Sequence, residues 1–167
     1  MRRYALARAI AAIMGRPAPP PPAPAPAEVH VSRGLFVTVT IEEVLRGCLG
    51  TVRGDGDLLA AAGRYSAEAA TLDSRFRPVL EAELPRLRLE ISVLTPPAPV
   101  DDIASIEGGR HGVVVRHAGR VGVLLPQVGR RHGWDGATLV REAAVKAEIP
   151  EGDHAAARVE VFEAETF

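Results

Sequence analysis

A proline-rich segment at residues 17–26 divides this chain, because seven of its ten residues are proline. Proline lacks the backbone N–H that helices and sheet ladders need, and runs of it adopt the extended polyproline II conformation. Residues 17–27 are therefore predicted to form a semi-rigid tether. The tether joins an N-terminal helix, predicted within residues 1–16, to a body formed by residues 28–167. A ligand for a proline-binding partner is the alternative interpretation of the same run.

The N-terminal segment has an apolar stripe with helical spacing, formed by Leu6, Ile10 and Ile13. We expect this helix to pack on the body. Its basic start is also typical of a signal peptide, but Arg8 leaves only residues 9–14 free of charge, which is shorter than the usual apolar region of about 7–15 residues. A cytoplasmic protein is therefore expected. No apolar run approaches the roughly 20 residues of a membrane span, so no membrane association is expected.

The distribution of charge argues against general nucleic-acid binding. The chain has 20 basic and 21 acidic side chains, and four of the arginines lie in residues 1–16, where there is no acid. The remaining residues hold 16 basic and 21 acidic groups, a net charge of −5. Binding to nucleic acid through phosphates relies on an excess of Lys and Arg, which this body lacks.

The body shows one order of elements twice: a β-hairpin, a helix and a closing strand. These are predicted at residues 35–52, 58–72 and 87–94 in the first half, and at 113–125, 135–147 and 158–162 in the second. An additional short helix is predicted over residues 79–84, ended by Pro85. Sequence identity between the halves is faint and centres on Gly47 and Gly122. The pattern predicts a duplicated α+β fold with a largely antiparallel sheet.

Residues 46–50, Arg-Gly-Cys-Leu-Gly, form the most unusual stretch, because strands normally avoid glycine and here two glycines flank the only thiol. If Cys48 is exposed beside Arg46, the cation favours the nucleophilic thiolate. The alternative is that Cys48 is a small buried core residue. By strand alternation Arg46 shares a face with Cys48, and a buried guanidinium needs a carboxylate partner.

Three further residues are candidates for the same site. In the functional interpretation, Asp73 is the carboxylate that meets Arg46, and Arg75 is a second anion-binding arm. In the structural interpretation, Asp73 and Arg75 cap the end of a helix, pair with each other and face water. His111 lies before a glycine at the entrance of a strand and is a candidate for proton transfer, with an exposed turn residue as the alternative. Neither a metal nor a cofactor is predicted, because histidine pairs with i, i+4 spacing and glycine-rich phosphate motifs are both absent.

An ordered series of short motifs covers almost the whole chain apart from the tether. The motifs are Leu6–Ile10, Gly34–Thr38, Leu45-Arg-Gly-Cys-Leu-Gly50, Ala69-Ala70, Asp73–Phe76, Glu83-Leu84, Glu90–Leu94, His111-Gly112, Leu125–Val128, Gly133-Trp134 and Lys146-Ala147. The series resembles the AMMECR domain family, whose prokaryotic members are called AmmeMemoRadiSam system protein A. Glu148 stands where that family usually has a glycine.

The resemblance implies one α+β domain with two related halves around a single curved, barrel-like sheet, and a cleft lined by the strand that carries Cys48. It also implies association with a Memo-type protein and a radical-SAM protein. Two functions remain open. One is an enzyme or enzyme component that acts on a small anionic substrate, with Cys48 as nucleophile, His111 as proton carrier and Arg46, Asp73 and Arg75 as binding residues. The other is a binding module for a small anion, a peptide or RNA.

Overall fold

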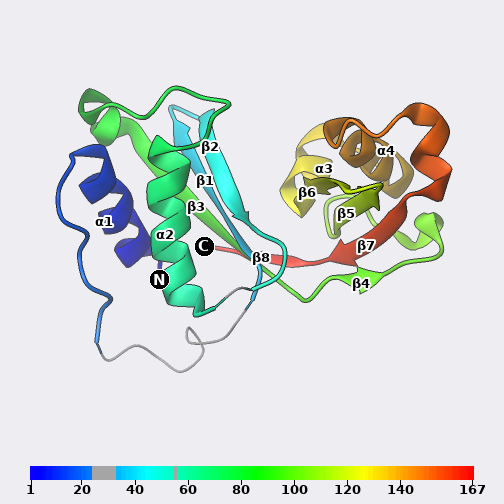
Figure 1. Cartoon of the computed structure of the whole chain (residues 1–167), viewed down its shortest axis with the longest axis horizontal. Helices are drawn as coiled ribbons and strands as arrows, with labels where there is room; N and C mark the ends of the chain where they lie inside the picture. The colour runs from blue at the N-terminus through cyan, green and yellow to red at the C-terminus, as the bar shows by residue number, and fades with distance from the viewer. Residues whose placement is uncertain (24–32, 55) are drawn as a thin grey trace. The chain divides into compact units, whose positions relative to one another are not determined.

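The chain forms two four-stranded antiparallel sheets, each with its own helices (Figure 1). The computed structural model describes residues 1–23, 33–54 and 56–167. These residues divide into a first unit, Met1–Val93 with Glu165–Phe167, and a second unit, Leu94–Ala164. Part of the predicted tether, at residues 24–27, lies outside the described residues. Residues 17–23 contain no helix or strand.

The first sheet has the strand order β2-β1-β3-β8. Its strands are β1 (Leu35–Ile41), β2 (Val44–Thr51), β3 (Leu87–Leu94) and β8 (Ala164–Thr166). Alternate residues of β1 are buried, as expected when one face of a sheet covers a core. The predicted hairpin and closing strand of the first half are therefore confirmed.

Helices α1 (Arg2–Ile13) and α2 (Leu58–Thr71) pack on each other and on the apolar face of this sheet. Asp57 begins α2 by accepting a hydrogen bond from the amide of Ala60 at 2.8 Å. The buried residues of α1 are mostly small: Tyr4, Ala5, Ala9 and Ala11. The predicted stripe of Leu6, Ile10 and Ile13 is only partly buried, with Leu6 and Ile13 packed against the core. Small residues allow the helix backbones to approach closely, and the Ser66 hydroxyl of α2 donates to the Ala5 carbonyl of α1 at 2.7 Å.

The second sheet has the order β4-β7-β5-β6. Its strands are β4 (Ala98–Pro99), β5 (Gly112–His117), β6 (Arg120–Leu124) and β7 (Arg158–Phe162). Its α-helices are α3 (Pro126–His132) and α4 (Gly136–Lys146), and short 3-10 helices lie at η3 (Ile103–Ser105) and η4 (Glu151–Ala156). The predicted hairpin, long helix and closing strand of the second half are confirmed.

Two helices differ from the prediction. The short helix expected at residues 79–84 is instead the 3-10 helix η2 (Glu81–Arg86), which includes Pro85. Proline removes one i to i−4 bond, which a 3-10 turn does not need. Helix α3 was not predicted, because its seven residues are too few to show helical periodicity.

The two sheets have matching topologies. When β1, β2 and β3 are equated with β5, β6 and β7, the remaining strands β8 and β4 correspond as well. Strand β4 follows β3 in the chain but pairs with β7, whereas β8 follows β7 but belongs to the sheet of β3. The two related halves and the α+β class are therefore confirmed. The expected single, curved, barrel-like sheet is a loose description, because the described strands form two separate sheets with no closed barrel.

A glycine at the same place in each half lets a helix lie directly on a strand. A Cβ on Gly47 of β2 would lie 1.9 Å from the Ala69 carbonyl oxygen of α2. A Cβ on Gly122 of β6 would lie 1.9 Å from the Ala143 carbonyl oxygen of α4. The faint identity between the halves therefore marks an equivalent position in each half where any side chain would separate helix from sheet.

The second residue after helix α4, Glu148, carries backbone strain. Glu148 has a φ of 56°, in the left-handed region that favours glycine. Its amide donates to the Val145 carbonyl at 2.9 Å, and the amide of Ile149 donates to the Ala144 carbonyl at 3.0 Å. These two hydrogen bonds close the end of α4 with Glu148 at the left-handed position. That backbone conformation is less favourable for glutamate than for the glycine usual at this place.

Replacing Gly47 by alanine is expected to lower the free energy of unfolding by about 1–3 kcal/mol or more, because the new methyl group meets backbone that cannot move aside. Gly122→Ala should have the same effect in the second half. Gly152→Ala is the matched control, since open space surrounds Gly152, and it should change stability by no more than about 0.5 kcal/mol. Urea unfolding of the three variants measures this. Equal stability of Gly47→Ala and Gly152→Ala would contradict the close approach.

Candidate functional site

Four of the five residues predicted to form the site lie on or beside β2, which is at the edge of the first sheet among the described strands. An edge strand exposes backbone N–H and C=O groups that another chain can pair with. At Cys48 both groups are occupied by side chains: the amide donates to Asp73 Oδ2 at 2.8 Å, and Arg75 Nη2 donates to the carbonyl at 2.9 Å. Asp73 and Arg75 thus take the place of a neighbouring strand at this residue.

Asp73 and Arg75 also bind each other. Arg75 donates from Nε to Asp73 Oδ1 at 2.9 Å and from Nη2 to Oδ2 at 2.7 Å, a two-pronged pair. The Asp73 side chain is only 2% exposed, whereas that of Arg75 is 47% exposed. The hydrogen bond from Arg75 lowers the pKa of Asp73 to about 2, and the same bond raises the pKa of Arg75. Asp73 is therefore ionised and fixed, and Arg75 reaches solvent.

Arg46 forms a separate ion pair with Glu83 of η2. The β1–β2 register shifts so that Gly47 and Leu45 pair with consecutive residues of β1, which leaves Arg46 in a bulge. Its guanidinium donates to both carboxylate oxygens of Glu83, and Glu83 also accepts from the Leu80 amide at 2.8 Å. The Arg46 bond lowers the pKa of Glu83 to about 2.

The predicted pairing of Arg46 with Asp73 is therefore wrong. The pairing of Asp73 with Arg75 instead agrees with the structural interpretation of these two residues. The sequence does not reveal the bulge that turns Arg46 toward η2. Glu83 lies in a motif of the series noted above, but nothing in the local sequence marks it as the partner of a residue 37 positions away.

The thiol of Cys48 lies on the face of the sheet opposite α2. Gly47 faces α2, and successive side chains of a strand alternate between faces. Cys48 is partly buried, and the Thr38 hydroxyl of β1, its cross-strand neighbour, donates to Sγ at 3.5 Å. Sequence reasoning missed Thr38, although its position between two core residues of β1 places it on the same face as the thiol.

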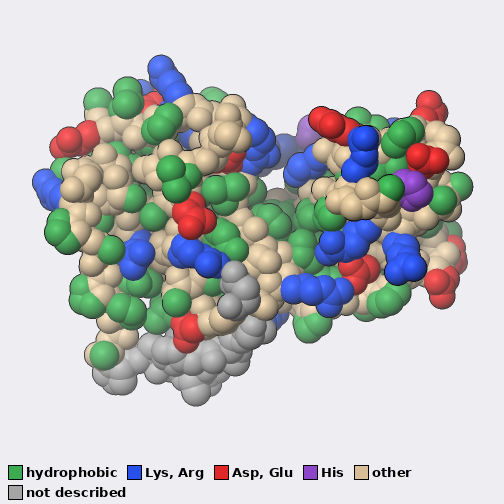
Figure 2. Space-filling view, viewed as in Figure 1, with side chains coloured by type: hydrophobic (Ala, Val, Ile, Leu, Met, Phe, Trp, Pro, Cys, Tyr) green, Lys and Arg blue, Asp and Glu red, His purple; other side chains and the backbone are tan. Residues whose placement is uncertain are grey.

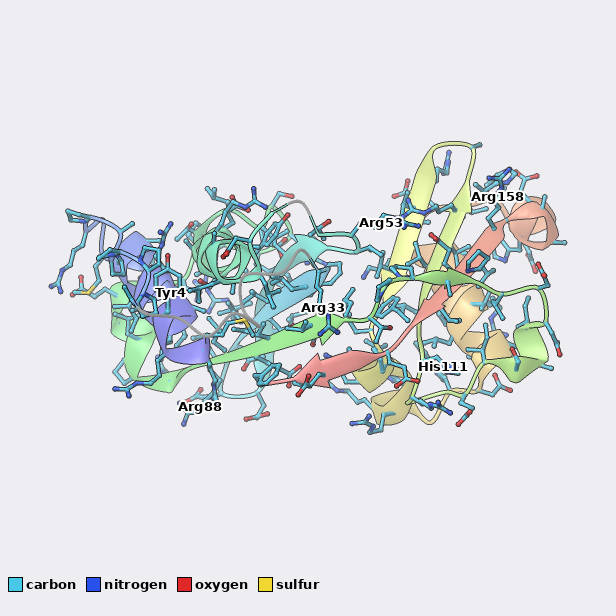
Figure 3. All side chains as sticks on the ribbon, turned by 90° about the horizontal axis from the view of Figure 1, so that it is seen from below. Tyr4, Arg33, Arg53, Arg88, His111 and Arg158 are labelled. Carbon is cyan, nitrogen blue, oxygen red and sulfur yellow. The ribbon has the colours of Figure 1, made fainter. Side chains whose placement is uncertain are left out.

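His111 lies in the second unit, just before β5 (Figure 3). Its Nδ1 accepts a hydrogen bond from the Glu107 amide at 3.0 Å. Hydrogen bonds thus join Cys48, Asp73 and Arg75 in the first unit. Arg46 lies on the same strand but binds Glu83, and His111 makes its contacts in the second unit. In the described ranges no three His, Cys, Asp or Glu side chains are arranged to hold a metal ion. No helix in this part of the chain has the length and apolar character needed to cross a membrane.

The fold and site together define a class: an α+β protein of two hairpin-and-helix halves, with a thiol on an edge strand closed by an Asp–Arg pair. The sequence profile of the AMMECR1 family matches residues 3–167, and the chain belongs to this family. It is 38% identical over 146 residues to protein MK0488 of Methanopyrus kandleri, covering 81% of this chain and 70% of that protein. It is 37% identical over 141 residues to protein Mbar_A1807 of Methanosarcina barkeri, with the same coverage.

A solved structure has the same fold. The crystal structure of the uncharacterized protein PH0010 from Pyrococcus horikoshii superposes with a TM-score of 0.92 at 31% sequence identity. The match covers 98% of this chain and 87% of that one. These relatives share the fold and family of the chain, and their names state no activity.

Acid should weaken the fold through Asp73 and Glu83. Both have pKa values of about 2 in the folded protein, against ordinary values of 3.8 and 4.5. Since the folded pKa values are lowered, the stabilisation is complete above the ordinary values and is lost as the pH falls from about 4.5 to about 2. Asp73→Asn and Glu83→Gln should each reduce the proton uptake on unfolding by up to about one proton in this window.

Urea unfolding between pH 2 and 6 measures this proton uptake from the slope of stability against pH. Glu81→Gln, in the first turn of the same 3-10 helix, is the control and should keep the slope of the unmodified protein. An unchanged slope in Asp73→Asn and Glu83→Gln would show that neither ion pair stabilises the folded state.

Proposed function

We propose that the first unit binds a small anionic molecule beside Cys48 and that Arg75 holds the anion. The observation that carries the proposal is the position of Arg75. Asp73 and the Cys48 carbonyl fix its guanidinium, yet nearly half of its side chain stays exposed. A cation held rigidly at a surface binds an anion without the entropy cost of ordering a free side chain.

The contacts support a different role for Arg46 and Asp73. The Arg46 side chain is 11% exposed and donates to both oxygens of Glu83, so an anion would have to displace a carboxylate. Asp73 is buried and repels anions, but it orients Arg75. Both residues therefore act as positioning residues in this proposal, and Arg75 alone faces the ligand.

A comparison of two alkylating reagents tests the proposal at the thiol itself. Iodoacetate is a small anion and iodoacetamide is its neutral analogue, and both react with Cys48, the single thiol. We expect Arg75→Gln to lower the ratio of the iodoacetate rate to the iodoacetamide rate by about fivefold, since about 1 kcal/mol of attraction is lost. Arg75→Lys keeps the charge and should retain most of the ratio.

Arg77→Gln is the matched control, because Arg77 lies in the same loop and is 74% exposed. It should leave the ratio unchanged. The proposal is wrong if Arg75→Gln and Arg77→Gln have equal ratios, because the anion is then attracted only by the general charge of the surface.

A second candidate is thiol chemistry at the same place, in which the Cys48 thiolate displaces a leaving group from a carbon of the anionic substrate. The C–S bond forms as the bond to the leaving group breaks, and the leaving group departs with the electron pair. The Thr38 hydroxyl favours it, because its hydrogen bond to Sγ at 3.5 Å orients the sulfur. In this candidate, the Cys48 proton passes to a base. The assignment of His111 as this base stays a prediction. The rate at which iodoacetamide alkylates Cys48 in the folded protein tests this candidate. A rate above that of an unfolded control supports Cys48 as a nucleophile, and no reaction before unfolding excludes that role.

Binding of a peptide or RNA remains an alternative. Addition of a peptide strand to β2 is disfavoured at Cys48, because Asp73 and Arg75 already occupy the backbone groups that a strand would use. The net charge of −5 outside residues 1–16 disfavours RNA.

Partnership with a Memo-type protein and a radical-SAM protein also stays a prediction that rests on the family resemblance, as does a cytoplasmic location. Affinity purification of the tagged chain from its native cells should recover both proteins in stoichiometric amounts. Recovery of neither, at a protein concentration where a known complex survives the same procedure, would contradict the partnership.

A further inference from the structure

The hydrogen bonds that hold Arg75 in place determine which of its donors are left for a ligand. A guanidinium group carries five N–H donors on three nitrogens. Nε donates to Asp73 Oδ1, and Nη2 donates both to Asp73 Oδ2 at 2.7 Å and to the Cys48 carbonyl at 2.9 Å. Nη1 makes no hydrogen bond or ion pair within the described ranges. A ligand therefore meets Arg75 at this nitrogen.

A single free nitrogen excludes the two-pronged contact that guanidinium groups make with phosphate and with free carboxylates. That contact uses parallel N–H groups on two neighbouring nitrogens, either Nε with one Nη or Nη1 with Nη2. In Arg75 both pairs include Nη2, which Asp73 and the Cys48 carbonyl already occupy. Arg75 therefore holds one oxygen of an anion, and tight binding requires a further contact of another kind.

The charge around Arg75 is also small. Arg75 forms an ion pair with Asp73, Arg46 forms one with Glu83, and Arg77 lies 3.9 Å from the same Glu83 carboxylate. Three cations thus share two carboxylates, which leaves a surplus of one positive charge. Basic and acidic side chains are interspersed on the face of the first unit that Figure 2 shows. The surplus matches a monoanion better than a phosphate monoester, which carries about −1.5 to −2 charges at neutral pH.

An aromatic ring supplies an apolar contact beside the guanidinium. The guanidinium carbon of Arg75 lies over the Phe76 ring, 5.3 Å from its centroid. The Phe76 amide donates to the Asp73 carbonyl at 3.0 Å, so the loop that carries the ring is held in place. Phe76 is only partly buried, and it belongs to neither of the two hydrophobic core clusters found in the described residues. The loop therefore presents a fixed cation and a partly exposed apolar ring next to each other.

We infer that the anion held by Arg75 is a monocarboxylate with an apolar body, an inference that rests on the function proposed above. One carboxylate oxygen accepts a hydrogen bond from Nη1, and the apolar body packs against Phe76. Arg75 remains the charged contact of the ligand. Apolar surface buried on Phe76 supplies the affinity that a second guanidinium contact would otherwise give.

Titration with four small compounds tests the chemistry of the ligand. The full chain is titrated at neutral pH and constant ionic strength with acetate, benzoate, benzamide and phenyl phosphate, and the amide NMR shift of Ser74 reports on the site. Benzoate should bind about tenfold more tightly than acetate, since burial of roughly 55 Å² of apolar surface gives this factor. Benzamide, which is uncharged, should bind at least about tenfold more weakly than benzoate. Phenyl phosphate should bind no more tightly than benzoate.

Two aromatic variants locate the apolar contact. Phe76→Ala should abolish the preference for benzoate over acetate and leave the acetate affinity unchanged, because Nη1 of Arg75 is still present. Phe167→Ala is the matched control, since it removes a 46% exposed aromatic ring from the same unit, and it should keep the preference. An equal preference for benzoate in the two variants would contradict the contact with Phe76.

Charge variants distinguish failure of this inference from failure of the proposed function. If Arg75→Gln and Arg77→Gln bind the two carboxylates equally, or if the unmodified chain binds neither, the proposed function is wrong and the inference falls with it. If binding depends on Arg75 but acetate binds as tightly as benzoate, or phenyl phosphate binds more tightly than benzoate, the anion site stands and the apolar monocarboxylate is overturned.

Discussion

The contact between Gly47 and the Ala69 carbonyl is the constraint on which the first unit depends. Because Gly47 has no side chain, the last turn of α2 lies against β2. The chain that leaves this helix therefore runs along the open edge of the sheet, where Asp73 and Arg75 reach the Cys48 backbone and Glu83 reaches Arg46. A single glycine thus determines where three charged side chains, those of Asp73, Arg75 and Glu83, can meet the edge strand.

This arrangement gives one short motif two separate roles. Gly47 and Arg46 serve the structure, the first by close packing and the second by an ion pair with η2. Cys48 points to the other face of the sheet, toward Thr38, and is not needed for that packing. The Asp73–Arg75 pair contributes to both roles. It occupies the backbone groups of Cys48 at the strand edge, and it holds the Arg75 guanidinium beside the strand that carries the thiol.

The second half uses the same packing for a different surface. Gly122 lets α4 lie on β6 as Gly47 lets α2 lie on β2, yet the edge strand here carries no Cys–Asp–Arg arrangement. Its basic residues at the hairpin end leave the sheet on both faces, Arg116 and Arg158 on one and Arg120 on the other. Duplication therefore preserved the backbone contact that packs helix on strand, whereas the charged side chains of each half lie outside that contact.

The sequence by itself determined the elements and their repeated order, because β-branched runs, helix caps such as Asp57 and apolar alternation act within a few residues. It also marked Arg46, Cys48, Asp73, Arg75 and His111 as one group of interest, of which His111 lies in the second unit. It left two partners open for Asp73, Arg46 or Arg75, and the tertiary structure selected Arg75. Only the tertiary structure decided the other partners, Glu83 for Arg46 and Thr38 for Cys48, and the presence of two sheets in place of one. The physical reason is that these pairings depend on a bulge in β2, on the path of the chain after α2 and on strand register, which arise from contacts between distant segments.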